Sequence, residues 1–191
     1  NLYSGFVRNG ANLEGEAKEE LKEINKQLST LGVQFSQNLL GETNAYKLII
    51  EDKKDLEGLP ENVRAAGAEA AKRDSMDGKW VYTTQRSSMY PFLTYSENRE
   101  LRKQIYRAYT MRGDNDNERD NKDICEEVFN LRVRKAKLLG YKSHADLILS
   151  TRMAKTSERV YDLLDQVWWP ALEVARQEVK DMQAIVDAEG K

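Results

Sequence analysis

Histidine and cysteine, the side chains that most often perform nucleophilic or metal chemistry, occur once each in this 191-residue sequence. A catalytic zinc ion needs at least three protein ligands and an open position for water. His144 stands in Lys142-Ser-His-Ala-Asp146, with no glutamate directly after it and no second histidine one helical turn later. We interpret His144 as structural or solvent-facing. We predict no catalytic, cofactor-binding or metal-binding residue in this chain.

Cys125, the single cysteine, excludes an internal disulfide and a zinc site built from cysteines. It lies in the helical pattern of residues 123–129, and His144 is the only histidine that could serve as its base. We therefore expect Cys125 to be a small buried apolar residue.

Acidic residues are frequent, but their arrangement indicates no site. Pairs such as Glu19 and Glu23 lie among lysines and predict a solvated helix face. The run from Asp114 to Glu118 resembles a calcium loop. However, Arg119 replaces the glycine at its sixth position and Cys125 the glutamate at its twelfth. We interpret it as an acidic connection between helices.

One group of side chains has the chemistry of a binding surface. Arg99, Arg102 and Tyr106 fall within two helical turns and can share a face. Such a face can hold a peptide carboxylate through bidentate hydrogen bonds, or it can fix a neighbouring helix of a larger protein. Both alternatives stay open, and these three are the candidate substrate-binding residues. Further arginines and tyrosines surround them: Tyr90, Tyr95, Tyr109 and Arg112.

Overall charge excludes some partners. The chain has 30 basic and 32 acidic side chains, a formal net charge of −2. This balance predicts no general attraction to nucleic acid or to anionic membranes. No apolar run approaches the ~20 residues that span a bilayer. We expect neither nucleic acid nor membrane as a partner.

Apolar residues spaced by three and four predict a mainly α chain. The clearest row is Leu21, Ile24, Leu28, Leu31, Phe35 and Leu39, on a helix from about residue 14 to 42. Further helices are predicted from Pro60 to about Arg73, from Ser143 to about Leu149, and after Thr156. Another is predicted to begin near Ser96, with Leu101, Ile105 and Ala108 on its inner face. A helix over about 121–139 is predicted to end at Gly140. Residues 86–91 show no period and are predicted to be a loop. Pro170 is predicted to bend the last helix near Val167.

Two short segments alternate instead of following a helical period. Tyr46, Leu48 and Ile50 alternate in the first, and Trp80 and Tyr82 in the second. We predict one small antiparallel ribbon of two strands, at about 45–51 and 79–84. The fold class is therefore a multi-helix array with one such ribbon.

The stretch Tyr90–Asn121 closely resembles a segment of the zinc oligopeptidases. This family includes thimet oligopeptidase, oligopeptidase A and bacterial peptidyl-dipeptidase, and the sequence resembles the peptidyl-dipeptidases most. The stretches Tyr3–Leu13, Phe35–Ala45, Arg134–Tyr141 and Met153–Thr156 resemble the same family. The resemblance implies a nearly all-helical fold with a deep channel between two lobes that admits short peptides. It also implies zinc-dependent peptide hydrolysis, performed by an H-E-x-x-H helix and a later glutamate.

Neither of those two motifs is present in a chain with one histidine. The resemblance therefore implies that residues 1–191 form a single segment, part of the amino-side lobe of a larger peptidase. The segment would form part of the wall of the substrate channel. Zinc and the catalytic groups would belong to the remaining part of the same polypeptide, which cleaves short peptides. We expect a cytoplasmic location, with the periplasm as the alternative. A stand-alone all-α scaffold or binding module without activity is the alternative function.

Overall fold

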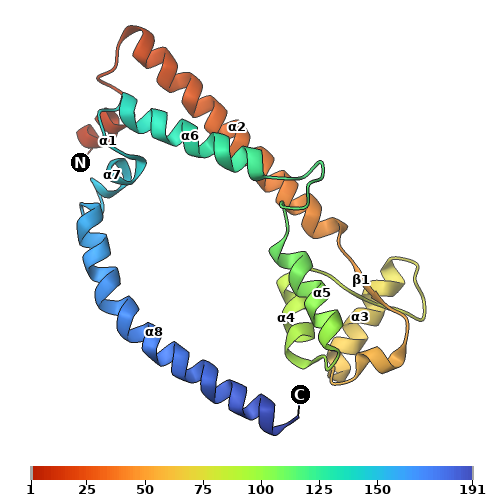
Figure 1. The fold of residues 1–191 in the computed structure, drawn as a ribbon. Coiled ribbons are helices and arrows are strands. Elements are labelled where there is room, and N and C mark those ends of the chain that lie inside the picture. Colours follow the sequence, from red (N-terminus) through yellow and green to blue (C-terminus); the bar gives the residue numbers. More distant parts are fainter. Residues whose placement is uncertain (1, 191) are drawn as a thin grey trace. The chain divides into compact units, whose positions relative to one another are not determined.

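The computed structural model describes residues 2–190 and is mainly helical, as predicted (Figure 1). In chain order the elements are α1 (Leu2–Arg8), α2 (Gly15–Ala45), β1 (Leu48–Ile50), the 3-10 helix η1 (Lys53–Leu56), α3 (Glu61–Arg73), β2 (Trp80–Tyr82), α4 (Arg86–Tyr95), α5 (Arg99–Thr110), α6 (Lys122–Leu138), α7 (His144–Leu149) and α8 (Ser157–Ala188). Among these described residues, no helix combines the length and the apolar character needed to cross a membrane.

The chain divides into two compact units. One comprises the residues up to Ile24 together with those from Leu131 onward, and the other comprises Asn25–Asn130. Helices α2 and α6 each contribute residues to both units. The assignment of residues 1–191 to one lobe of a larger protein stays a prediction.

The predicted ribbon is present in the second unit, with shorter strands than expected. Strands β1 and β2 pair antiparallel, with Leu48 opposite Tyr82 and Ile50 opposite Trp80. Leu48 and Ile50 are buried while Ile49 between them is exposed, so the alternation in the sequence did mark one inward face.

A single apolar core holds the second unit together. The rings of Tyr82 and Phe92 lie with their centroids 4.6 Å apart and tilted by 45°, a favourable arrangement for aromatic pairs. Buried side chains from the ribbon, η1, α3, α4 and α5 complete this core: Leu48, Ile50, Leu56, Leu59, Val63, Met89 and Ile105. Two strands alone are marginal in water, so the helices packed around them are what make the ribbon stable.

The loop predicted over residues 86–91 is wrong, because these residues form the first half of α4. Pro91 lies inside this helix and removes one backbone hydrogen bond. Met89 and Phe92, three residues apart, both point into the core and are almost completely buried. Their burial offsets the missing hydrogen bond. The helix was not recognised in the sequence because no longer apolar period marks it.

The start of the next helix is also corrected. Ser96, predicted to cap it, ends α4 instead, with its N–H bonded to the Phe92 carbonyl at 3.0 Å. Asn98 caps α5, and its side chain accepts the Leu101 N–H at 3.1 Å. Leu101, Ile105 and Ala108 face inward on α5 as expected, with Ile105 fully buried.

The other predicted helix ends are confirmed. Ser143 caps α7 by accepting the Asp146 N–H at 3.1 Å, and Thr156 caps α8 by accepting the Arg159 N–H. Gly140, with φ of +82°, follows α6 in the left-handed conformation that favours glycine.

In the first unit, α1 is fixed by one arginine. Arg8 donates through Nη2 to the Leu147 carbonyl and through Nη1 to the Thr151 hydroxyl at 2.9 Å. Leu21 and Ile24 of α2 are buried, together with Leu131, Ala136 and Leu147. The apolar row of α2 is thus buried at its beginning, whereas Phe35 further along is exposed.

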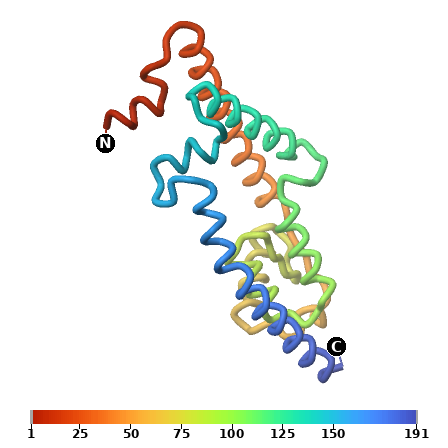
Figure 2. Tube along the Cα trace, turned by 60° about the vertical axis from the view of Figure 1, so that its left-hand side comes forward, coloured from red at the N-terminus to blue at the C-terminus, as the bar shows by residue number. Residues whose placement is uncertain are grey.

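Helix α8 differs from the other long helices, because none of its residues is buried. Pro170 lies inside it as predicted, and α8 is one continuous helix that curves along its length (Figures 1 and 2). The proline therefore does not end the helix.

We expect Gly67→Ala to destabilise the chain by about 1–3 kcal/mol. A Cβ atom at Gly67 of α3 would lie 2.8 Å from both Cζ and the hydroxyl oxygen of Tyr82. The buried Tyr82 ring cannot retreat without disturbing Phe92. Gly32→Ala in α2 is the matched control: its Cβ meets nothing within 4 Å, and helix propensity should raise stability by about 0.5–1 kcal/mol. Denaturant unfolding followed by circular dichroism measures both variants, and equal midpoints for the two would contradict this packing.

Candidate functional site

The three residues predicted to bind substrate all lie on α5, but the structure gives them different roles. Nη1 of Arg102 donates to the Ser96 carbonyl at 2.5 Å and so ties α5 to the end of α4. Arg99 and Tyr106 point outward, and within residues 2–190 no hydrogen bond or ion pair engages their side chains. Arg102 is thus engaged within the fold, while the side chains of Arg99 and Tyr106 are exposed. The assignment of these three residues to substrate binding stays a prediction.

A second group of side chains converges beside them. The guanidinium of Arg86, the first residue of α4, lies beside the Tyr109 hydroxyl and interacts with it. The guanidinium carbon of Arg112 lies 3.9 Å from the centroid of the Tyr109 ring, within cation–π range. Nη1 of Arg112 also donates to the Thr43 hydroxyl at 2.9 Å, and its Nε donates to the Tyr109 carbonyl at 2.9 Å. Two arginines therefore flank one phenol; we call Arg86, Tyr109 and Arg112 the arginine–tyrosine cluster.

Electrostatics distinguish this phenol from the tyrosine of the core. The hydrogen bond from Arg86 is the main cause that lowers the pKa of Tyr109, because a nearby cation favours the phenolate. Burial raises the pKa of Tyr82 to about 12. The arginine–tyrosine cluster is therefore a positively charged surface, and planar guanidinium groups match the geometry of a carboxylate.

The sequence did not indicate Arg86 as a member of this group. Arg86 lies in the segment that was predicted to be a loop, so no helical face could be assigned to it. The spacing of Met89 and Phe92 was the available signal, since it places residues 86–95 on one helix whose first residue faces α5.

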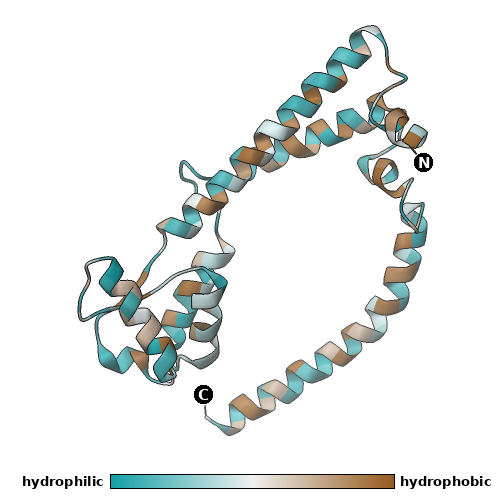
Figure 3. Cartoon of the chain, turned by 180° about the vertical axis from the view of Figure 1, so that it is seen from behind, coloured by the Kyte–Doolittle hydropathy of each residue, from teal (hydrophilic) through white to brown (hydrophobic). Residues whose placement is uncertain are grey.

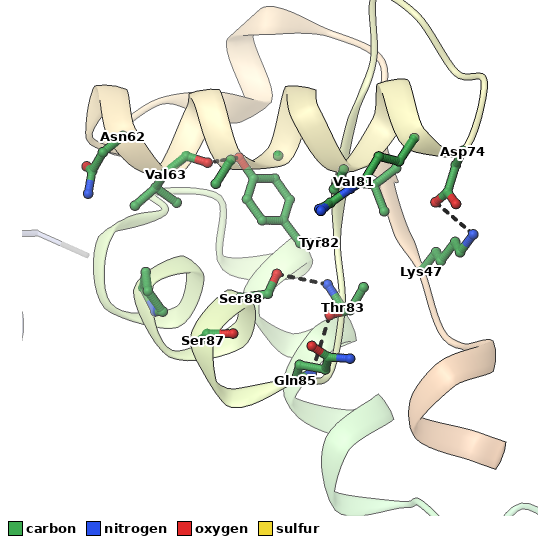
Figure 4. A pocket seen from close by; sticks show the side chains of 15 residues that line it. Lys47, Asn62, Val63, Asp74, Val81, Tyr82, Thr83, Gln85, Ser87 and Ser88 are labelled. Atoms are coloured by element: carbon green, nitrogen blue, oxygen red, sulfur yellow. Dashed lines mark hydrogen bonds and ion pairs between the residues drawn. The ribbon is translucent and has the colours of Figure 1, made fainter. Parts of the chain in front are cut away.

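A pocket of about 680 Å³ lies between α3, β2 and the start of α4 (Figure 4). Two of its ionic groups, Lys47 and Asp74, are paired with each other at 2.7 Å. The Ser88 hydroxyl likewise accepts the Thr83 N–H at 3.0 Å. No histidine, cysteine or pair of carboxylates lines this pocket, so its walls offer binding surface rather than acid–base chemistry.

The surroundings of His144 do not fit a zinc ion. Nδ1 is buried without a hydrogen-bond partner. Burial is the main cause that lowers the pKa of His144, and the positive charges of Arg132 and Lys135 lower it further. These cations would repel a divalent metal. In the described part of the chain, no three histidine, cysteine or carboxylate side chains lie close enough together to hold a metal ion.

Cys125 is exposed, not buried as predicted. On α6 its neighbour Ile124 faces inward, and successive helical residues differ in direction by about 100°. The helical period identified the helix, while Ile124 rather than Cys125 occupies its inner face.

One lysine bridges three carboxylates of the acidic connection between α5 and α6. Nζ of Lys122 lies 2.8 Å from Asp114, 2.8 Å from Asp116 and 2.7 Å from Asp120. Hydrogen bonds from Lys122 lower the pKa of Asp120 to about 2. An ammonium group thus satisfies these carboxylates, in agreement with a structural connection.

Comparison with known proteins decides the family. A sequence model described as Peptidase family M3 matches residues 92–191, which is more than half of the chain. The chain belongs to peptidase family M3. The resemblance to oligopeptidases drawn from the sequence is thereby confirmed.

Individual M3 relatives match almost the whole chain. Oligopeptidase A of Haemophilus influenzae is 35% identical over 99% of this chain. The probable cytosolic oligopeptidase A of Arabidopsis thaliana is 33% identical over 96%, and dipeptidyl carboxypeptidase of Escherichia coli is 29% identical over 97%. Identity to these oligopeptidases A thus exceeds identity to the dipeptidyl carboxypeptidase, although the sequence resemblance had favoured the latter group.

The chain spans 27–28% of the length of these relatives. The rest of their length has no counterpart in this chain.

Proposed function

We propose that this chain is a non-catalytic segment of a zinc metallopeptidase that hydrolyses short peptides, and that it forms part of the wall of the substrate channel. The observation that carries the proposal is the similarity to oligopeptidase A and dipeptidyl carboxypeptidase over 96–99% of this chain but 27–28% of theirs. A segment shared in this way contributes to the fold of the larger protein.

Zinc and the catalytic groups are assigned to the remaining part of the polypeptide. The chain has one histidine, and that histidine is surrounded by positive charge. The role left to this segment is to shape the space in which the peptide is held and to exclude larger substrates.

The channel-wall role is supported by the exposed chemistry of α5. Arg99, Tyr106 and the arginine–tyrosine cluster all belong to α5 or adjoin it, and their guanidinium groups can bind the carboxylate of a peptide. A short peptide carries its carboxylate at one end, so such groups would orient it without taking part in bond cleavage.

For location we propose the cytoplasm, with the periplasm as the alternative. One Arabidopsis thaliana relative is named as a probable cytosolic enzyme and another as an organellar one. Cell fractionation with an antibody against the chain would test the assignment.

The complete coding sequence provides the first test of function. We expect it to contain an H-E-x-x-H segment, and the full-length protein to bind one zinc ion and to cleave fluorogenic short peptides until a chelator is added. The 191-residue chain alone should do neither. Metal analysis and peptide hydrolysis measure both. A reading frame without that segment would instead favour the stand-alone scaffold, and chelator-sensitive cleavage by the 191-residue chain would refute the proposal.

In the full-length protein, Arg99→Ala should raise KM for short peptides about tenfold, the loss expected for one charge-assisted hydrogen bond, with little change in kcat. Arg102→Ala should instead lower the unfolding temperature, since it removes the bond to the Ser96 carbonyl. Arg107→Ala, which removes a cation two turns further along α5 and about 80° round the helix from Arg99, is the matched control. If Arg99→Ala leaves KM at its original value, the α5 surface does not bind substrate.

A further inference from the structure

We infer that α8 carries the docking surface for the remaining part of the same M3 peptidase chain, which presents apolar side chains bordered by basic groups. This inference rests on the proposed function and names the partner that the segment needs. It derives from the exposure and charge of one helix.

Large apolar side chains recur along α8 at steps of three and four residues. Together with Ala175, which fills the seven-residue step after Leu172, they form a row that we call the α8 face: Tyr161, Leu164, Trp168, Leu172, Val179, Met182 and Val186. A second row, Leu163, Val167, Val174 and Ile185, widens it on one side. Apolar residues occur along the length of α8 in Figure 3, and all of these residues except Leu172 are exposed.

Such a surface requires a cover. Exposed apolar patches of this extent mark interaction sites in soluble proteins. Yet nothing in α8 is buried, although the helix has 32 residues. Within the first unit, to which α8 belongs, the hydrophobic free energy of this face is therefore not used.

The width of the face favours a globular protein over a second copy. The two rows cover about half of the helix circumference. A two-stranded coiled coil buries a narrower seam, formed by two positions in every seven. A helix with a broad apolar face is instead typical of one that is covered from several directions inside a larger core.

Charge further defines the partner. Helix α8 carries seven acidic and three basic side chains. Two copies would bring like charges together, and a helix that binds anionic membranes is rich in lysine and arginine on its polar side. Asp165 borders the α8 face and Glu178 lies between its two rows, so the partner should carry lysine or arginine opposite these two positions.

The comparisons indicate where this partner is found. The match to the M3 family model includes all of α8, and the chain spans 28% of the length of oligopeptidase A of Haemophilus influenzae. A much larger part of an M3 peptidase thus lies outside this chain and is available to cover the α8 face.

Two adjacent tryptophans provide the test. Trp168 is 58% exposed and lies at the centre of the α8 face, whereas Trp169 is 61% exposed and points about 100° away, among polar residues. In the full-length protein, Trp168→Ala should lower the thermal midpoint by about 2–4 °C, and Trp169→Ala should have a much smaller effect. In the 191-residue chain, both changes should shift the midpoint equally and by less than about 1 °C, because both side chains are exposed there. Trp168→Phe supplies a milder variant with a smaller drop, if Trp168→Ala fails to fold.

Equal midpoints for Trp168→Ala and Trp169→Ala in the full-length protein would overturn the inference. Concentration-dependent dimers of the 191-residue chain that Trp168→Ala abolishes, without a selective effect in the full-length protein, would also overturn it in favour of a second copy. Peptide hydrolysis by the unaltered full-length protein is measured in parallel. If the full-length protein hydrolyses peptides but the two variants have equal midpoints, the docking inference is refuted and the proposed function stands. If it hydrolyses no peptide but Trp168→Ala lowers the midpoint selectively, the proposed function is refuted and the docking inference stands.

Discussion

Apolar surface on a helix costs free energy in water until other parts of a protein cover it. In α8, apolar side chains occupy about half of the helix circumference, and none of its residues is buried. This constraint connects the observations made on the chain. A segment with its own core in each unit can fold locally, but a helix of this kind gains its stability from packing against other parts of a protein. Membership of peptidase family M3 and coverage of 28% of a relative's length supply a reason for that dependence.

The second unit shows how the same physics positions chemistry. Met89 and Phe92 hold α4 against the ribbon despite Pro91, and α4 in turn brings Arg86 to Tyr109 of α5. Arg102 fixes the turn between these two helices through the Ser96 carbonyl. The positively charged surface of α5 is therefore a consequence of core packing, and its free groups are those that no structural bond requires.

Local patterns predicted most of the fold, because their causes are local. Alternation at Leu48 and Ile50 identified a strand, and the hydroxyl groups of Ser143 and Thr156 identified helix starts. The errors occurred where tertiary contacts decide. Pro91 obscured a helix that buried side chains stabilise, and Asn98 rather than Ser96 became the cap. The pairing of Arg86 with Tyr109 joins residues more than 20 positions apart, so the spacing of Met89 and Phe92 could place Arg86 on a helix but could not predict its partner.

Hydrogen exchange of the backbone amides of α8 tests the central claim most directly. It should be measured in the 191-residue chain and in the full-length protein under identical conditions. We predict that α8 exchanges at least about tenfold more slowly in the full-length protein, while amides in the core around Tyr82 and Phe92 change little. Equal exchange of α8 in both proteins would contradict the claim that this helix is covered by the rest of the peptidase.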